Sequence, residues 1–229
     1  MKWIQKSDEP QEILQWKQKF RNRQHRMADY SDLNDNLEIK GQLKASLLSE
    51  QGYICCYCSK RIGNENSHIE HFRPKGQPQY RGLSLDYTNL LASCQGFRER
   101  EENCGHSKGN DFDEELLISP LEEDCETLFT FSNRGKVQAV DGNERAVYTI
   151  KTLQLDTPAL NSAREEAMWA SGAMNDIDEA ECKKLLDLFT KVDENGRYAS
   201  FCDAIAYHLK KRLQELTSAE LLKEETRDV

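Results

Sequence analysis

The stretch HIEHFRPKG, residues 68–76, places two histidines, a glutamate, an arginine and a lysine within nine positions. Successive side chains of a β-strand point to opposite faces, so His68 and Glu70 would share one face and His71 would lie on the other. A carboxylate oxygen of Glu70 can bind a hard divalent cation, and the imidazole of His71 can take a proton from water. Such a base needs an orienting partner for its second ring nitrogen, which a backbone carbonyl could supply. The stretch therefore predicts a metal-assisted hydrolytic site.

Four cysteines, two before this stretch and two after it, predict a zinc site. Cys55 and Cys58 form a C-x-x-C pair, and Cys94 and Cys104 supply a second pair. Four thiolates around a tetrahedral Zn²⁺ make a closed structural site. The second pair is separated by nine residues, QGFREREEN, so we expect a loop to bulge out between its ligands. The alternative is four independent buried thiols, and the choice of Cys55 over its neighbour Cys56 rests on spacing alone.

The remaining cysteines are scattered singly among apolar neighbours and are expected to be ordinary packing residues: Cys125, Cys182 and Cys202. The chain begins without an apolar stretch of signal-peptide length and contains no run of eighteen apolar residues. We therefore expect a cytoplasmic protein without a membrane segment. A reducing compartment favours metal binding over disulfides as the use of the clustered cysteines.

The charge of the chain is unevenly distributed. Of 229 residues, 38% are hydrophobic and 31% charged, and the net charge is −9. Residues 1–110 carry 17 basic against 14 acidic side chains, a net of +3, whereas residues 111–229 carry 14 against 26, a net of −12. A nucleic-acid binder usually has a basic footprint. This chain would therefore contact nucleic acid through a small local patch or rely on a partner.

The elements expected before residue 110 lead the chain to the candidate site. Residues 1–6 alternate in the manner of a short strand, and a helical run follows Pro10. A second helix with leucines at helical spacing ends near Gly52, as a C-terminal glycine would end it. Residues 53–73 are expected to form a β-hairpin with a long loop, and residues 85–94 a short apolar element that brings Asn89 and Cys94 nearby.

After residue 110 the pattern becomes mostly helical. FTFSNRGKVQAV, residues 129–140, predicts a second hairpin, and helical periodicity begins at Asn143. Thr157 before Pro158 is a suitable helix entry. The last helix has one apolar stripe, which consists of Phe201, Ile205, Leu209 and Leu213. We interpret this stripe as core packing in preference to a partner-binding face. Residues 221–229 are expected to fray.

The order of these motifs resembles the HNH endonuclease superfamily. C-x-x-C, HIEHFRPK, DYTNLLASC and CGHSKGN follow one another over residues 53–112. The resemblance implies a ββα-metal fold with one catalytic Mg²⁺ or Mn²⁺ and a structural Zn²⁺. Further segments, KWIQKSDEP, LLSEQGYICCYC, LLISPLEED, FTFSNRGKV and YTIKTLQLDTPALNSAREEA, resemble the PtuB family, the nuclease subunits of Septu anti-phage systems. That likeness implies a PtuA-like ATPase as partner.

Carried over by position, the resemblance assigns His71 as general base, Glu70 as a ligand of the catalytic ion and Asn89 as the residue that ties the catalytic loop in place. His68 would assist the metal or the substrate phosphate, or make a structural hydrogen bond.

The last metal ligand is expected from the helix that begins at Cys104. Many superfamily members have His or Asn directly after this cysteine, whereas this chain has Gly105. His106 is the nearest competent side chain and is assigned the second metal contact, with Asn110 as the alternative.

Three basic residues near the motif, Arg73, Lys75 and Lys108, are candidates for contacts with the substrate phosphate. The alternative for each is an ordinary solvated charge. His25 and His208 lack comparable neighbours and receive no role.

The sequence thus predicts an α+β protein with an HNH nuclease core and zinc-binding knuckle at residues 53–118. An N-terminal strand and helices, residues 1–52, would lead into the core, and a hairpin with helices, residues 119–229, would contact the partner. The expected function is phosphodiester hydrolysis of nucleic acid, with DNA favoured by analogy to the fold. The alternatives are cleavage of RNA such as tRNA by the same chemistry, or a zinc-ribbon binding module without catalysis.

Overall fold

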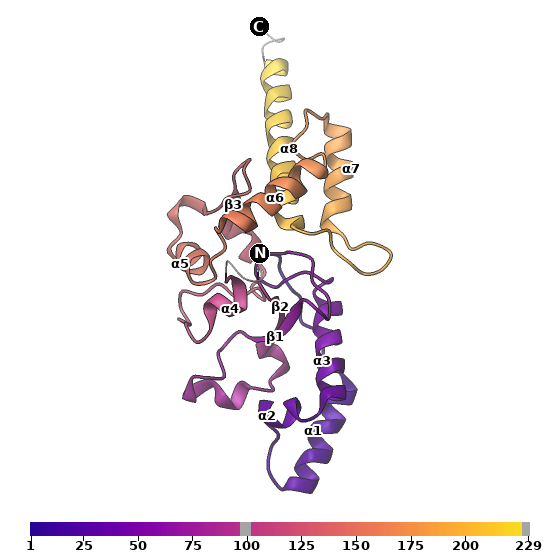
Figure 1. Cartoon of the computed structure of the whole chain (residues 1–229). Coiled ribbons are helices and arrows are strands. Elements are labelled where there is room, and N and C mark those ends of the chain that lie inside the picture. Colours follow the sequence, from indigo (N-terminus) through magenta and orange to yellow (C-terminus); the bar gives the residue numbers. More distant parts are fainter. Residues whose placement is uncertain (97–101, 226–229) are drawn as a thin grey trace.

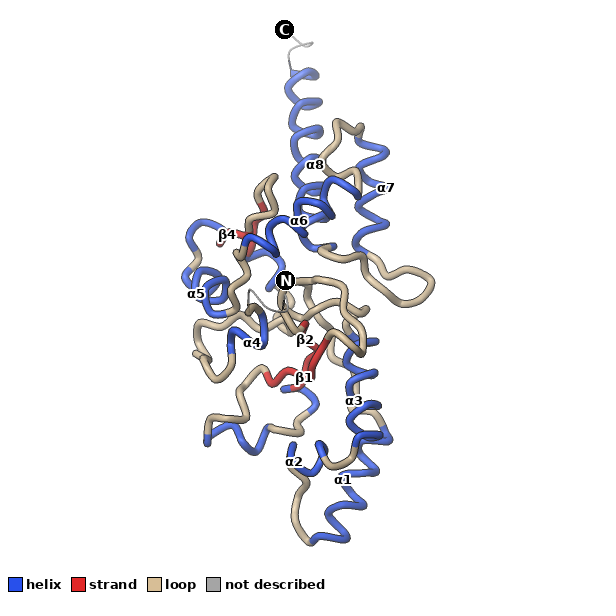
Figure 2. Tube along the Cα trace, viewed as in Figure 1, coloured by secondary structure: helices blue, strands red, loops and turns tan. Residues whose placement is uncertain are grey.

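The computed structural model describes residues 1–96 and 102–225 as a mixed α+β structure in which helices surround two small sheets (Figures 1 and 2). One end of the molecule consists of the helices α1 (Gln11–Gln24), α2 (Tyr30–Asn34) and α3 (Leu37–Glu50). The middle contains a sheet of the strands β1 (Ser67–His71) and β2 (Leu90–Cys94). The other end consists of the helices α6 (Pro158–Ala170), α7 (Glu179–Thr190) and α8 (Cys202–Glu225). One continuous core runs through all three parts and includes Ile13, Leu91 and Leu209.

The central sheet pairs strands that are far apart in the sequence. β1 and β2 are antiparallel, with Ser67 opposite Cys94 and His71 opposite Leu90. The expected hairpin within residues 53–73 is therefore wrong, because β1 pairs with β2 and residues 53–62 contribute only an isolated bridge between Ile54 and Arg61. The physical reason is that residues 55–60, between the two bridge residues, form a tight turn that brings two cysteines together. This turn leaves no extended partner for β1.

The N-terminal residues form no strand, contrary to expectation. Met1 and Ile4 are buried, and the Ile4 amide donates to the Pro120 carbonyl at 2.8 Å. The alternating pattern of residues 1–6 thus reflects insertion of apolar side chains into the core.

The N-terminal helices begin and end at local signals. α1 follows Pro10 as expected, and α3 begins where the Asn36 side chain accepts from the Ile39 amide at 3.2 Å. α3 ends just before Gly52, whose φ of 57° lies in the left-handed region that glycine adopts readily.

The second half has the expected order of elements. β3 (Phe129–Phe131) and β4 (Val137–Ala139) form the predicted hairpin, and α5 (Glu144–Thr152) follows. The Thr157 hydroxyl caps α6 by accepting from the Leu160 amide at 3.3 Å. The short 3₁₀ turns of the described chain are Pro78–Leu83, Tyr87–Asn89, Cys125–Leu128 and Val140–Gly142.

The last helix confirms the interpretation of its apolar stripe. Phe201, Ile205 and Leu209 are buried and Leu213 packs at the edge of the core. Helix α8 continues through Glu225, so the expected fraying is wrong for residues 221–225, and the rest of that segment lies outside the described residues. Within the described chain, none of the helices combines the length and apolar character required to cross a membrane.

Candidate active site and metal centre

The four predicted cysteines converge. The sulfurs of Cys55, Cys58, Cys94 and Cys104 all lie within 4.8 Å of one another, and all four residues are buried. Sulfurs at the corners of a tetrahedron with metal bonds of about 2.3 Å would be ~3.8 Å apart. The observed distance between the sulfurs of Cys58 and Cys94 is 3.9 Å. The donor set therefore fits Zn²⁺, and the predicted convergence of the sulfurs is confirmed.

The first pair lies in a tight knuckle. The Cys55 amide donates to the Lys60 carbonyl at 2.8 Å, and the Ser59 amide donates back to the Cys55 carbonyl at 3.0 Å. Ser59 completes the reversal with a φ of 59°. Cys56 is buried outside the four-sulfur group, as the spacing predicted.

The second pair comes from two different elements. Cys94 ends β2, and its amide donates to the Cys55 sulfur at 3.3 Å, a bond that favours a thiolate there. Cys104 begins α4 (Cys104–Lys108) and has a φ of 56°. The loop predicted to bulge between them falls largely on residues 97–101, outside the described residues.

Protonation of the sulfur group reflects its burial. Burial raises the pKa of the Cys104 thiol, and hydrogen bonds to the other sulfurs raise it further. At Cys55 burial acts in the same direction but is outweighed by hydrogen bonds from Cys104 and the other thiols, so its pKa is lowered. Four sulfurs in one buried site thus favour a bound cation that allows all of them to ionise.

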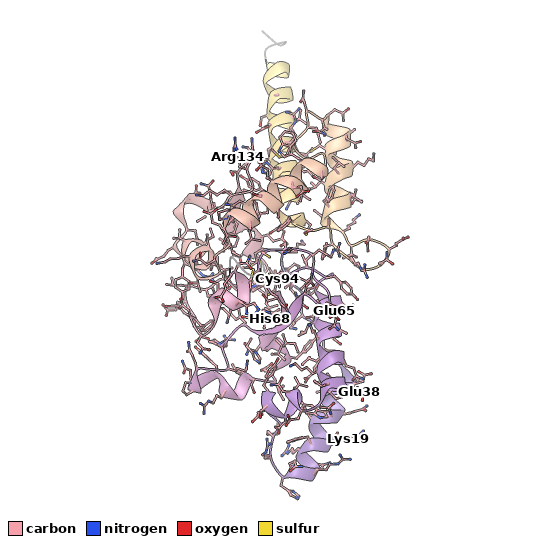
Figure 3. The ribbon with its side chains drawn as sticks, viewed as in Figure 1. Lys19, Glu38, Glu65, His68, Cys94 and Arg134 are labelled. Atoms are coloured by element: carbon pink, nitrogen blue, oxygen red, sulfur yellow. The ribbon has the colours of Figure 1, made fainter. Side chains whose placement is uncertain are left out.

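Strand β1 presents His68 and Glu70 on one face. His68 Nε2 lies 3.3 Å from Glu70 Oε2, as expected from the alternation of side chains (Figure 3 labels His68 and Cys94). Burial would raise the pKa of Glu70, but the hydrogen bond with His68 and the nearby Lys108 ammonium lower it. Glu70 is therefore an ionised carboxylate in a buried position, which is the form that binds a divalent cation.

The two oxygens of Glu70 have different neighbours. Oε1 lies 3.0 Å from the Lys108 ammonium and accepts from the Tyr57 hydroxyl at 3.2 Å. Oε2 faces His68 and the backbone of Gly105. With Oε1 held by two donors, Oε2 is the oxygen that is available to a metal ion.

The position of Lys108 differs from its expected role as a phosphate contact. Its side chain is 1% exposed, and its ammonium contacts Glu70 Oε1 and donates to the carbonyls of His71 and Phe72 at 2.9 and 3.2 Å. Because an ammonium has three N–H groups, these acceptors use all of them. Lys108 is thus an internal counter-charge and has no donor left for a substrate phosphate.

Gly105 occupies the position at which the sequence departs from the superfamily pattern. A Cβ atom there would meet Glu70 Oε2 at 2.4 Å and His68 Nε2 at 2.7 Å. The departure therefore has a steric reason, since a side chain at this position would fill the space beside both candidate ligands.

His106 and Asn110, the two candidates for the last metal ligand, differ in position: His106 lies against His68, and Asn110 lines the cavity. The His106 ring is exposed, with its centroid 4.5 Å from that of His68. Asn110 lines a cavity of about 260 Å³ together with His68, Glu70 and His71. In the described residues, the four cysteines are the one group of three or more His, Cys, Asp or Glu with ligand atoms within 4.8 Å. The choice between His106 and Asn110 remains a prediction.

His71 is oriented by the backbone. Its Nε2 lies 3.0 Å from the Ser84 carbonyl, which can only accept, so Nε2 carries the ring proton of the neutral imidazole. Nδ1 then bears the free lone pair and has no hydrogen-bond partner among the described residues. Burial, with help from the Lys75 charge, lowers the pKa of His71 to about 4, so the ring is neutral near pH 7. The side chain borders the cavity beside Glu70.

Asn89 ties together the loop between the strands. Its Oδ1 accepts from the Arg73 amide at 2.7 Å, and its Nδ2 donates to the carbonyls of Arg73 and Leu83 at 3.0 and 3.2 Å. Leu83 directly precedes Ser84, so the same side chain supports the residue that orients His71.

The two other basic candidates differ in position. Arg73 is exposed in part and pairs with Glu114 at 2.8 Å. Lys75 lines the cavity, and its ammonium lies 4.6 Å from the centre of the Tyr30 ring. Lys75 is therefore the better placed of the two for a phosphate in the cavity.

Sequence reasoning missed two aromatic residues. Tyr57 lies inside the C-x-x-C pair yet contacts Glu70, and Tyr30 of α2 packs edge-on against the His71 ring with centroids 4.5 Å apart. The position of Tyr57 between two ligands was a usable signal, whereas nothing in the sequence links Tyr30 to residue 71.

No protein-family model matches the chain, but comparison with known proteins finds relatives. It is 26% identical to the "Retron Vc95 putative HNH endonuclease" of Vibrio cholerae serotype O1 biovar El Tor over 61% of the chain and 69% of that protein. It is 24% identical to the "Retron Ec83 putative HNH endonuclease" of Escherichia coli over 74% of the chain and 80% of that protein. The chain is thus an HNH endonuclease relative.

Within this class the chain resembles the Septu protein PtuB. It is 29% identical to the PtuB of Bacillus mycoides (strain KBAB4) over 48% of the chain and 45% of that protein. The likeness therefore covers less than half of either protein.

Proposed function

We propose that the protein is a metal-dependent HNH endonuclease of the cytoplasm that hydrolyses phosphodiester bonds in nucleic acid, with DNA preferred. β1, β2 and α4 would form its ββα-metal core within residues 53–118. It would act as the effector subunit of an anti-phage complex with a PtuA-like ATPase.

The orientation of His71 is the observation that carries the proposal. The Ser84 carbonyl fixes the proton on Nε2, which leaves Nδ1 as the basic atom of a neutral ring at the cavity. Nδ1 would take the proton of the attacking water. The Asn89 hydrogen bonds to Arg73 and Leu83 would keep this geometry fixed.

Glu70 Oε2 would hold the catalytic Mg²⁺ or Mn²⁺, with His106 as second ligand and Asn110 as the alternative. His68 Nε2 lies close enough to Glu70 Oε2 to join them. A divalent ion bound there supplies Lewis-acid stabilisation of the phosphate and of the leaving oxygen. Lys75 would neutralise phosphate charge at the cavity, and Arg73 would do so nearer the surface.

The partner proposal rests on the likeness to PtuB and on charge. Residues 111–229 carry a net charge of −12, which makes this half a poor surface for phosphates and a suitable one for protein contacts. We assign residues 119–229 to the ATPase interface and residues 1–118 to substrate.

The test is cleavage of plasmid DNA, single-stranded DNA and tRNA in Mg²⁺ or Mn²⁺, with and without the co-purified ATPase. Cleavage should require the divalent ion and stop at chelator concentrations that leave one zinc per chain. Zinc-loaded protein that binds nucleic acid but cleaves none of the three, with or without its partner, would identify a zinc-ribbon module instead. Cleavage of tRNA alone would move the substrate to RNA.

A further inference from the structure

Helix α1 is strongly basic in an acidic protein. The whole chain has a net charge of −9, yet residues 13–28 contain no acidic side chain. They contain five basic ones, namely Lys17, Lys19, Arg21, Arg23 and Arg26. The candidate active site supplies few free cations of its own: Lys108 contacts Glu70 and Arg73 pairs with Glu114, which leaves Lys75 at the cavity.

Two of these five cations fix the helix. Lys17 contacts Glu9 and donates to the Leu85 carbonyl at 2.5 Å, and Arg26 pairs with Asp32 at 2.6 Å. The other three cations, Lys19, Arg21 and Arg23, are exposed and have no ion-pair partner among the described residues. Solvated cations on a rigid helix are the ordinary means of binding a phosphate backbone.

Helix α1 is linked to the surroundings of His71 at two points, through Lys17 near its middle and through the chain that follows its C-terminus. Lys17 contacts Leu85, which adjoins the Ser84 carbonyl that orients His71. The chain leaving α1 enters α2, where Tyr30 packs against the His71 ring. With fourteen residues α1 is ~21 Å long. Its cations therefore lie within about one duplex turn, ~34 Å, of the loop that holds the base.

The outward face of α1 is polar and uncharged. The amide side chains recur at positions that share one helical face, and all are exposed: Gln11, Gln15, Gln18 and Asn22. The opposite face carries buried Ile13 and packs with α3. Figures 1 and 3 show α1 at the free end of the molecule, with Lys19 marked on it.

We propose that α1 is a docking helix for duplex DNA, which holds the phosphate backbone through Lys19, Arg21 and Arg23 within one turn of the scissile bond. The inference rests on the proposed nuclease function and adds the surface that positions its substrate. DNA is the occupant because its major groove, about 12 Å wide, admits an α-helix, whereas the major groove of duplex RNA is too deep and narrow.

The test compares two triple variants in the His71→Ala background, so that binding is measured without cleavage. One carries Lys19→Gln, Arg21→Gln and Arg23→Gln. The matched control carries Lys151→Gln, Lys210→Gln and Lys211→Gln, which remove the same charge from exposed positions of α5 and α8. Circular dichroism and zinc content establish that both are folded. The probe is a labelled DNA duplex of about three turns, titrated between about 50 and 200 mM KCl.

We expect the α1 variant to bind roughly tenfold or more weakly and to lower the slope of log affinity against log salt by about 2 to 3, since each phosphate contact contributes ~0.9. The control should keep the slope of the parent. Equal losses in both variants, or none in either, would overturn the inference. Loss of ATPase association with unchanged DNA binding would reassign α1 to the partner and also overturn it.

Two further outcomes separate this inference from the proposed function. If the parent protein binds duplex RNA as tightly as duplex DNA, and the α1 substitutions weaken both equally, α1 does not dock in the major groove of DNA. If the wild-type protein cleaves DNA while the α1 variant retains full affinity, the docking surface fails and the nuclease stands. If wild type binds through α1 but never cleaves, the nuclease fails and the surface stands.

Discussion

Replacing Lys108 by methionine is expected to lower the free energy of unfolding by about 3 to 5 kcal/mol. Methionine keeps much of the apolar stem but removes the ammonium, which lies 3.0 Å from Glu70 Oε1 and 2.9 Å from the His71 carbonyl in a position that is 1% exposed. The substitution leaves a carboxylate buried without its counter-charge.

The expected loss of unfolding free energy follows from the buried groups that Lys108→Met leaves without a partner. Breaking one partner of a buried pair costs about 3 to 5 kcal/mol because the other charge stays desolvated. The carbonyls of His71 and Phe72 also lose their donor, and each such bond to a charged group contributes roughly 1.5 to 3 kcal/mol in isolation. These contributions overlap, since one ammonium makes all three contacts, so we keep the lower range.

The assay is urea denaturation of the zinc-loaded protein, followed by tryptophan fluorescence. Lys184→Met is the matched control, because Lys184 pairs with Glu181 at 3.2 Å with 73% of its side chain exposed, where an ion pair contributes at most about 1 kcal/mol. A Lys108→Met protein with unchanged stability and weaker substrate binding would show that Lys108 is not a counter-charge for Glu70. That result would restore Lys108 as a phosphate contact.

Three further predictions concern zinc, Gly105 and Asn89. Cys94→Ser should abolish stoichiometric zinc and destabilise the fold, whereas Cys56→Ser should keep one zinc per chain by mass spectrometry; equal zinc content in both would contradict the assignment. Zinc should also be released as pH falls, because its thiol ligands must be deprotonated. Gly105→Ala should weaken Mn²⁺ binding measured by electron paramagnetic resonance, since its Cβ would meet Glu70 Oε2 at 2.4 Å; unchanged affinity would show that the metal lies elsewhere. Asn89→Ala should cost about 2 to 3 kcal/mol in denaturation, and a loss below 1 kcal/mol would show that its three hydrogen bonds do not stabilise the loop.

Local signals in the sequence were sufficient to predict most of the helices. Thr157 caps its helix through a single side chain, and Gly52 ends α3 through its own backbone freedom. The alternation of β1 likewise placed His68 beside Glu70, because side-chain direction along a strand depends only on position.

The pairing of β1 could not be predicted in the same way. Its partner β2 begins nineteen residues after β1 ends, as the bounds His71 and Leu90 show, and nothing local favours that partner over the nearer residues 53–62. Residues 55–59 turn back on themselves, with the Ser59 amide donating to the Cys55 carbonyl and a positive φ at Ser59, so they offer no extended edge to β1.

The role of Lys108 was missed for a related reason. A lysine near a catalytic motif is usually solvated or bound to phosphate, and only the approach of α4 to β1 buries this one against Glu70. Gly105 allows that approach, so the residue that departed from the superfamily pattern also explains the changed role of its neighbour.

We propose that the His71 imidazole removes a proton from water, and the single-turnover cleavage rate of His71→Ala tests this role. Gln42→Ala, at an exposed position of α3 to which no role is assigned, is the control. We expect a loss of about 10² to 10⁴-fold for His71→Ala, with zinc content, folding and nucleic-acid affinity unchanged, and no loss for Gln42→Ala. Equal rates for the two variants would contradict it.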